Sequence, residues 1–188
     1  FAVPQPFTGM LADMYNRKKI MVIANVLSSI VALCLIFIDG SDDLVLLYFL
    51  VFLLMALHAL EVPASRAALP NIVKENELLT ANAIDTATWS AMLGFGCAIG
   101  GFVTAKYGVN VAFIVDSITF LISALIISTI HIPQKKNKKT HGSIIKKGIS
   151  DIIYGWKYIL SKRDVLKLVF AKSVWTIGGG GLIFLIVL

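Results

Sequence analysis

Residues 20–38 read IMVIANVLSSIVALCLIFI, an apolar run without a charged side chain. A helix that crosses the roughly 30 Å hydrocarbon core of a bilayer needs about 20 mostly apolar residues, because each helical residue rises about 1.5 Å. Three basic residues, Arg17 to Lys19, precede the run, and an acidic turn at residues 39–43 follows it. The run therefore predicts a transmembrane helix with one basic and one acidic end.

Further runs of bilayer length follow along the chain. Complete runs lie at Leu44 to about Leu60, Ala81 to about Ala105, and Val109 to Ile130. A fifth, from about Leu166 to Leu188, is interrupted near its start by Lys167 and Lys172, and residues 1–7 resemble the end of an earlier helix. Soluble helices of such length have a polar face, which these runs mostly lack. We expect an all-α, polytopic transmembrane helical bundle, of which this chain is an internal fragment.

The composition agrees with a membrane protein. Of the 188 residues, 57% are hydrophobic and only 15% charged, which is too apolar for an ordinary soluble domain. The net charge of +6 comes from lysines and arginines clustered beside the apolar runs, so we expect no nucleic-acid partner. Phosphate-binding, zinc-binding and Gly-x-Ser-x-Gly motifs are absent from the sequence, so we expect no enzyme activity, no cofactor and no metal.

The basic residues alternate between the connections. Fourteen lie in the connections at residues 8–19, 61–80 and 131–164, against one, Lys106, in the turns at 39–43 and 105–108. Basic connections stay on the cytoplasmic side of a membrane. We therefore expect a multi-pass protein of the cell (inner) membrane whose basic loops are cytoplasmic.

The longest connection contains a second pattern. Between Ile145 and Leu160 the apolar residues recur at spacings of three and four, and Lys146, Lys147 and Lys157 fall between them. Ser143 is a suitable cap for such a helix. The pattern predicts an amphipathic helix on the cytoplasmic membrane surface, with its lysines near anionic headgroups.

Charged side chains within apolar segments are candidates for proton or substrate coupling, because unpaired charges in a bilayer cost several kcal/mol. The candidates are His58, Glu61, Asp85 and Asp116. His58 and Glu61 are one helical turn apart and could form a titrating pair, which makes Glu61 our first candidate for the proton site. The alternative is that each charge pairs with a neighbouring helix or reaches water at the interface.

Glycines form another pattern in the run that begins at Ala81. Gly96, Gly100 and Gly101 recur at near-four-residue spacing, together with Gly94. Small residues at this spacing let a neighbouring helix approach closely. They indicate a helix-packing surface, which is either a fixed notch or part of a moving element.

The segment Gly9-Met10-Leu11-Ala12-Asp13-Met14-Tyr15-Asn16-Arg17-Lys18-Lys19 resembles the signature loop between the second and third helices of the major facilitator superfamily. Pro63 to Pro70, Ala81-Asn82-Ala83, Gly100-Gly101 and Phe113 to Phe120 resemble the branch of that family with macrolide exporters and the enterobactin exporter. The resemblance implies that the chain runs from the end of helix 2 to helix 7 of a twelve-helix fold. Residues 1–131 would belong to the N-terminal half, 132–163 to the cytoplasmic central linker and 164–188 to the C-terminal half.

The resemblance also implies a function. It implies a secondary transporter that exports a drug-like or siderophore-like molecule in exchange for protons by alternating access. Gly9, Asp13, Arg17 and Lys18 would form the conformational latch of the signature loop. Met14 and Asn16 replace the Arg and Gly of the pattern, and Cys97 replaces the Pro of the antiporter motif G-P-x-x-G-G. The expected partners are the small-molecule substrate, protons, the lipid bilayer and the remaining helices of the full-length chain.

Two other functional classes remain open from the residues alone. A non-transporting membrane scaffold or sensor would use the amphipathic helix of the central linker as its partner surface. A membrane-embedded enzyme would need a polar catalytic cluster, and the visible helices show none in sequence. Dissipation of a proton gradient by substrate in vesicles would separate a transporter from both.

Overall fold

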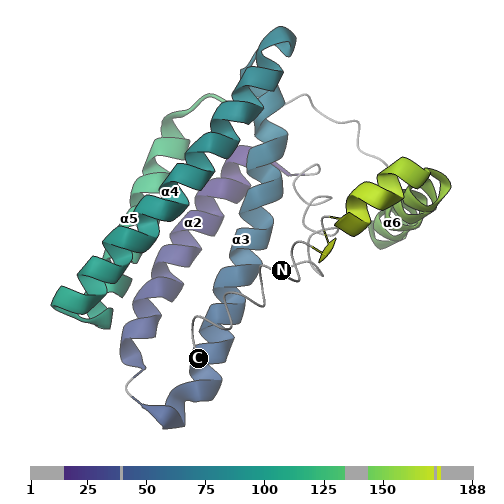
Figure 1. The fold of residues 1–188 in the computed structure, drawn as a ribbon. Coiled ribbons are helices and arrows are strands. Elements are labelled where there is room, and N and C mark those ends of the chain that lie inside the picture. The colour runs from purple at the N-terminus through teal and green to yellow at the C-terminus, as the bar shows by residue number, and fades with distance from the viewer. Residues whose placement is uncertain (1–14, 39, 134–143, 172, 175–188) are drawn as a thin grey trace. The chain divides into compact units, whose positions relative to one another are not determined.

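The computed structural model describes residues 15–38, 40–133, 144–171 and 173–174. The chain divides into two units, residues 1–139 and 140–188, which are described separately. The first unit contains four long helices: α2 (Arg17–Cys34), α3 (Leu44–Ile72), α4 (Leu78–Tyr107) and α5 (Val109–Thr129) (Figure 1). Short 3-10 turns, at Leu35–Phe37, Ser41–Asp43 and Glu75–Glu77, precede or follow them. The described residues contain no strand, and the all-α prediction is confirmed.

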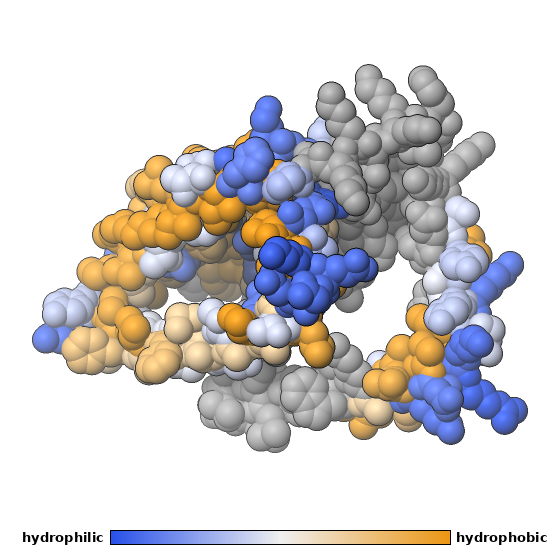
Figure 2. All heavy atoms as spheres, turned by 90° about the horizontal axis from the view of Figure 1, so that it is seen from above, coloured by the Kyte–Doolittle hydropathy of each residue, from blue (hydrophilic) through white to orange (hydrophobic). Residues whose placement is uncertain are grey.

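All four helices are long and apolar enough to cross a membrane, which confirms the four complete runs as helices. Their outward surfaces are rich in large apolar side chains, and Figure 2 shows hydrophobic residues gathered over these helices. Val45, Leu79 and Leu125 are 82%, 84% and 66% exposed. Water penalises an apolar surface of this extent, whereas lipid does not. The fold is therefore that of a multi-pass membrane protein.

Local sequence sets two of the helix boundaries. Asn16 caps α2, because its side-chain oxygen accepts a hydrogen bond from the backbone N–H of Lys19 at 3.1 Å. Gly108 alone joins α4 to α5 and has φ 87° and ψ 165°, a conformation that only glycine adopts without strain. The residue at position 16 that departs from the family pattern thus has a structural role of its own.

Helix α3 is longer than the apolar run that predicted it. The run ends near Leu60, but the helix continues through Pro63 and Pro70 to Ile72. Each proline removes one backbone donor, which normally ends or kinks a helix. Packing offsets this loss here, because Ala64 and Ala68 of the extension are buried against Met21 of α2.

Helix α2 packs against both α3 and α5, and small side chains make this contact possible. The buried residues of α2 include Ala24, Asn25, Ser28, Ser29 and Ala32. Alanine and serine allow close backbone approach between membrane helices. The three helices α2, α3 and α5 therefore form the packed core of this unit.

Helix α4 packs mainly against α5, and none of its residues is buried within the described structure. A Cβ atom added to Gly96, Gly100 or Gly101 would meet no described atom within 4 Å. These glycines thus face open space in the described part of the chain. Their role as a helix-packing surface stays a prediction.

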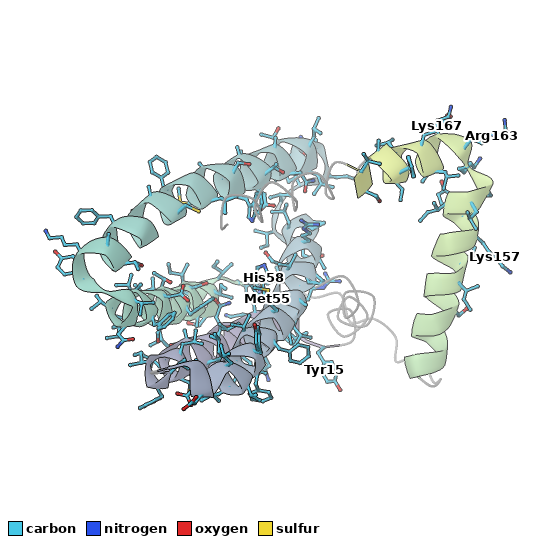
Figure 3. All side chains as sticks on the ribbon, turned by 60° about the horizontal axis from the view of Figure 1, so that its bottom comes forward. Tyr15, Met55, His58, Lys157, Arg163 and Lys167 are labelled. Carbon is cyan, nitrogen blue, oxygen red and sulfur yellow. The ribbon has the colours of Figure 1, made fainter. Side chains whose placement is uncertain are left out.

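In the second unit, α6 (Ile144–Ser161) forms where the sequence predicts the amphipathic helix, and residues 163–171 are also helical. Lys157, Arg163 and Lys167 extend away from these helices (Figure 3). Lys167 lies 3.9 Å from Asp164 in an exposed ion pair. Ser143, the predicted cap, lies outside the described residues, and the membrane-surface location of α6 stays a prediction.

Candidate functional site

A cavity of about 260 Å³ lies among α2, α3 and α5. It combines apolar walls with a few polar side chains, which is the usual composition of a small-molecule site. Figure 3 labels two of its residues, Met55 and His58, on adjacent turns of α3. The lining consists of Ala24, Asn25, Ser28, Leu54, Met55, Leu57, His58, Glu61, Asp116 and Phe120.

His58 and Glu61 form the pair that their spacing predicts. The Nδ1 atom of His58 lies 3.6 Å from the Oε2 atom of Glu61, and the two side chains are 54% and 28% exposed. A pair this exposed contributes little to stability, because solvent screens the attraction. The pair is therefore not a major source of stability for α3.

Asp116 enters the same cavity from α5. The structure therefore brings together three of the four predicted coupling residues, His58, Glu61 and Asp116. Asp85 lies on α4, is exposed and is not part of the lining. Among the described residues that line the cavity there is no lysine or arginine, and its acidic side chains are Glu61 and Asp116.

Asn25 and Ser28 also line the cavity, and the sequence analysis missed both. Asn25 is only 5% exposed, and its side-chain Nδ2 donates a hydrogen bond to the carbonyl of Met21 at 2.9 Å. A carbonyl only accepts, so this bond fixes which end of the amide is nitrogen. The sequence does carry a signal for Asn25 and Ser28, because both are polar residues inside the apolar run at residues 20–38.

A buried hydroxyl pair lies next to the cavity. The Oγ atoms of Ser29 on α2 and Ser117 on α5 are 2.7 Å apart, and the residues are 1% and 2% exposed. Their chain neighbours, Ser28 and Asp116, line the cavity. The pair thus fixes the register in which α2 and α5 present those two side chains.

Only part of the predicted latch falls within the described structure. Gly9 and Asp13 lie outside the described residues. Arg17 donates from Nη1 to the backbone carbonyl of Ala67 at 2.6 Å, which ties the start of α2 to the last turns of α3. A cation is favourable there, because carbonyls near a helix C-terminus carry partial negative charge. Lys18 lies beside Arg17 in the first turn of α2 and is partly exposed.

The sequence profile of the Major Facilitator Superfamily matches residues 1–188. The chain belongs to the Major Facilitator Superfamily. The names of its relatives describe them as MFS-type transporters or as a putative exporter.

Several relatives within the Major Facilitator Superfamily come from Bacillus subtilis (strain 168). The uncharacterized MFS-type transporter YkuC is 25% identical over 179 residues, which cover 92% of this chain and 41% of YkuC. The putative bacilysin exporter BacE is 26% identical over 152 residues, covering 79% of this chain and 38% of BacE. The chain therefore spans about two fifths of the length of these relatives. No solved structure matches it significantly.

Proposed function

We propose that the complete protein is a proton-coupled exporter of a drug-like or siderophore-like small molecule, in the branch that resembles macrolide and enterobactin exporters. The observation that supports this proposal is a cavity lined by His58 and Glu61 of α3 and by Asp116 of α5. The name of one relative, a putative bacilysin exporter, supports export as the direction of transport.

The cavity suggests how protons couple to transport. Ionised carboxylates at membrane depth are costly unless a proton, a cation or a hydrogen-bond donor compensates them. Glu61 and Asp116 share one cavity, and the imidazole of His58 lies 3.6 Å from Glu61, so that a small side-chain rotation brings the two into hydrogen-bond range for direct proton exchange. In this proposal, protons and substrate occupy the cavity at different stages of the cycle.

The conformational change is assigned to the signature loop. Arg17 already binds the carbonyl of Ala67, and we propose that Asp13 and Lys18 add the contacts that hold one state of the latch. A carboxylate at a helix N-terminus contributes up to about 2 kcal/mol, a modest bias that substrate or protons can reverse. The two halves of the full-length protein then rock about the cavity by alternating access.

The proposed topology keeps the basic connections in the cytoplasm. Residues 1–131 belong to the N-terminal half, 132–163 to the central linker and 164–188 to the C-terminal half. The α6 helix lies along the cytoplasmic membrane surface of the cell membrane, with its lysines near anionic headgroups. Labelling of Lys135 to Lys139 from outside intact cells by a membrane-impermeant reagent would refute this orientation.

The coupling proposal is tested in vesicles that contain the complete protein. A pH gradient is imposed, and its dissipation on addition of candidate substrates is followed with a pH-sensitive dye. We expect Glu61→Gln to abolish substrate-dependent proton movement, because glutamine keeps the shape but carries no exchangeable acidic proton. Glu75→Gln is the matched control, because Glu75 is exposed and lies outside the cavity lining. Unchanged coupling in Glu61→Gln would remove Glu61 from the mechanism.

A further inference from the structure

The cavity contains more hydrogen-bond acceptors than donors. Glu61 and Asp116 supply two carboxylates, and Asn25 supplies an amide whose nitrogen is already committed to the carbonyl of Met21. Its Oδ1 is a hydrogen-bond acceptor on the same side chain. Asn25 is 5% exposed and lines the cavity, so we count this oxygen among the acceptors that an occupant of the cavity meets.

Apolar groups complete the lining. Leu54, Met55, Leu57 and Phe120 form walls, and Phe120 supplies an aromatic ring, a group that attracts cations. A dry cavity of about 150 Å³ is enough for benzene, so about 260 Å³ holds an aromatic ring with a short polar arm. The size and the walls therefore fit a small amphiphile.

We infer that the cavity binds the ammonium group of an amphiphilic amine, whose N–H groups are accepted by Asn25, Glu61 and Asp116 while Met55 and Phe120 contact its apolar body. An alkylammonium group has only hydrogen-bond donors and carries a positive charge, so it complements a cavity with acceptor oxygens and two carboxyl groups. An anion meets two like charges, and an alcohol brings one donor without a charge. The inference rests on the proposed function, because it names the substrate class of the same cavity.

The inference is tested first on the unaltered, complete protein in detergent solution. Binding of 2-phenylethylamine is measured by titration calorimetry at pH 7, beside its neutral and anionic analogues, 2-phenylethanol and 3-phenylpropionate. We expect the amine to bind at least about tenfold more tightly than either analogue, because hydrogen bonds between charged groups are stronger than those between neutral groups. Equal affinity for the amine and the alcohol would overturn the inference.

Two pairs of variants then locate the site. Glu61→Gln and Asn25→Leu should each weaken amine binding at least about fivefold, because each removes one acceptor of the ammonium group. Their controls are Glu75→Gln and Asn82→Leu. Asn82 makes the same 2.9 Å bond to the carbonyl four residues earlier, Leu78, but is exposed on α4. Affinity that is unchanged in Glu61→Gln and Asn25→Leu, or lost equally in the controls, would place the amine elsewhere.

The binding and transport assays separate this inference from the proposed function. Amine binding that depends on Glu61 without any proton movement in vesicles would support the cavity's ligand class and contradict proton-coupled export. Glu61-dependent proton movement driven by other substrates, without amine binding, would support export and overturn the inference. Loss of both after Asp116→Asn, with the same melting temperature as the parent, is the result expected when both are correct.

Discussion

The hydroxyl pair between α2 and α5 makes a direct energetic prediction. Ser29 and Ser117 are 2.7 Å apart and almost fully buried, so replacing either one by alanine leaves the other without its partner across the interface. Interhelical hydrogen bonds in membrane proteins average about 0.6 kcal/mol and reach about 1.7 kcal/mol. The short distance and complete burial place this bond in the upper part of that range, at about 1–1.7 kcal/mol.

The double variant should behave differently from the two single ones. Removing both hydroxyls leaves no orphan polar group, so Ser29→Ala with Ser117→Ala should cost less than the sum of the single substitutions. We expect a coupling energy of about 1 kcal/mol from the double-mutant cycle, which compares the parent, the two single variants and the double variant. In each single variant the remaining hydroxyl can turn to a backbone carbonyl of its own helix, which recovers part of the lost energy. The measured coupling energy then falls towards the average for interhelical hydrogen bonds.

The measurement is reversible unfolding of the complete protein in mixed micelles, driven by sodium dodecyl sulfate and followed by tryptophan fluorescence. Ser90→Ala is the control, because Ser90 is exposed and bonds only within α4, to the carbonyl of Thr86. That substitution should change the free energy of unfolding by less than about 0.5 kcal/mol. If the costs of Ser29→Ala and Ser117→Ala add up to the cost of the double variant within about 0.3 kcal/mol, the two hydroxyls do not interact. That result would refute the argument that the pair sets the register of α2 and α5.

Three further predictions follow from contacts described above. Gly108→Ala should lower the free energy of unfolding by about 1–3 kcal/mol, because a φ of 87° with a ψ of 165° strains any residue other than glycine. Gly40→Ala is the control and should leave the free energy of unfolding unchanged, because Gly40 has an extended φ of −170° and a Cβ atom there meets no atom within 4 Å. Arg17→Gln should lower the free energy of unfolding by about 1 kcal/mol, because the hydrogen bond to the carbonyl of Ala67 is lost. It should also shift the distances between spin labels placed on the two halves of the protein. Distances identical to those of the parent would show that Arg17 is not part of the latch. His58→Gln should change stability by less than about 0.5 kcal/mol, since its side chain is 54% exposed, but should alter the protons moved per substrate in vesicles; unaltered stoichiometry would exclude His58 from coupling.

Hydropathy predicts the four membrane helices because bilayer thickness constrains segment length directly. It fails at the end of α3, where Pro63 and the nearby charges Glu61 and Arg66 mark a helix end in sequence. The structure continues the helix because Ala64 and Ala68 pack against α2, and tertiary packing of this kind leaves no local signal.

The site is predictable only in part for a related reason. His58 and Glu61 are visible as a pair because both lie on one helix, three residues apart. The approach of Asp116 depends on how α5 is rotated against α3, which one sequence does not determine. Asn25 carries a signal, a polar side chain in an apolar run, but its importance emerges only from its burial at the cavity.

The order of the helices in the chain differs from their order in space. Helix α5 packs on α2, although two helices, α3 and α4, lie between them in the chain, and α4 contacts mainly α5. During biosynthesis α2 and α3 can therefore associate as soon as both have left the translocon. Among the described helices the main partner of α4 is α5, so a nascent chain arrested before Val109 should expose α4 to crosslinking with chaperones or lipids.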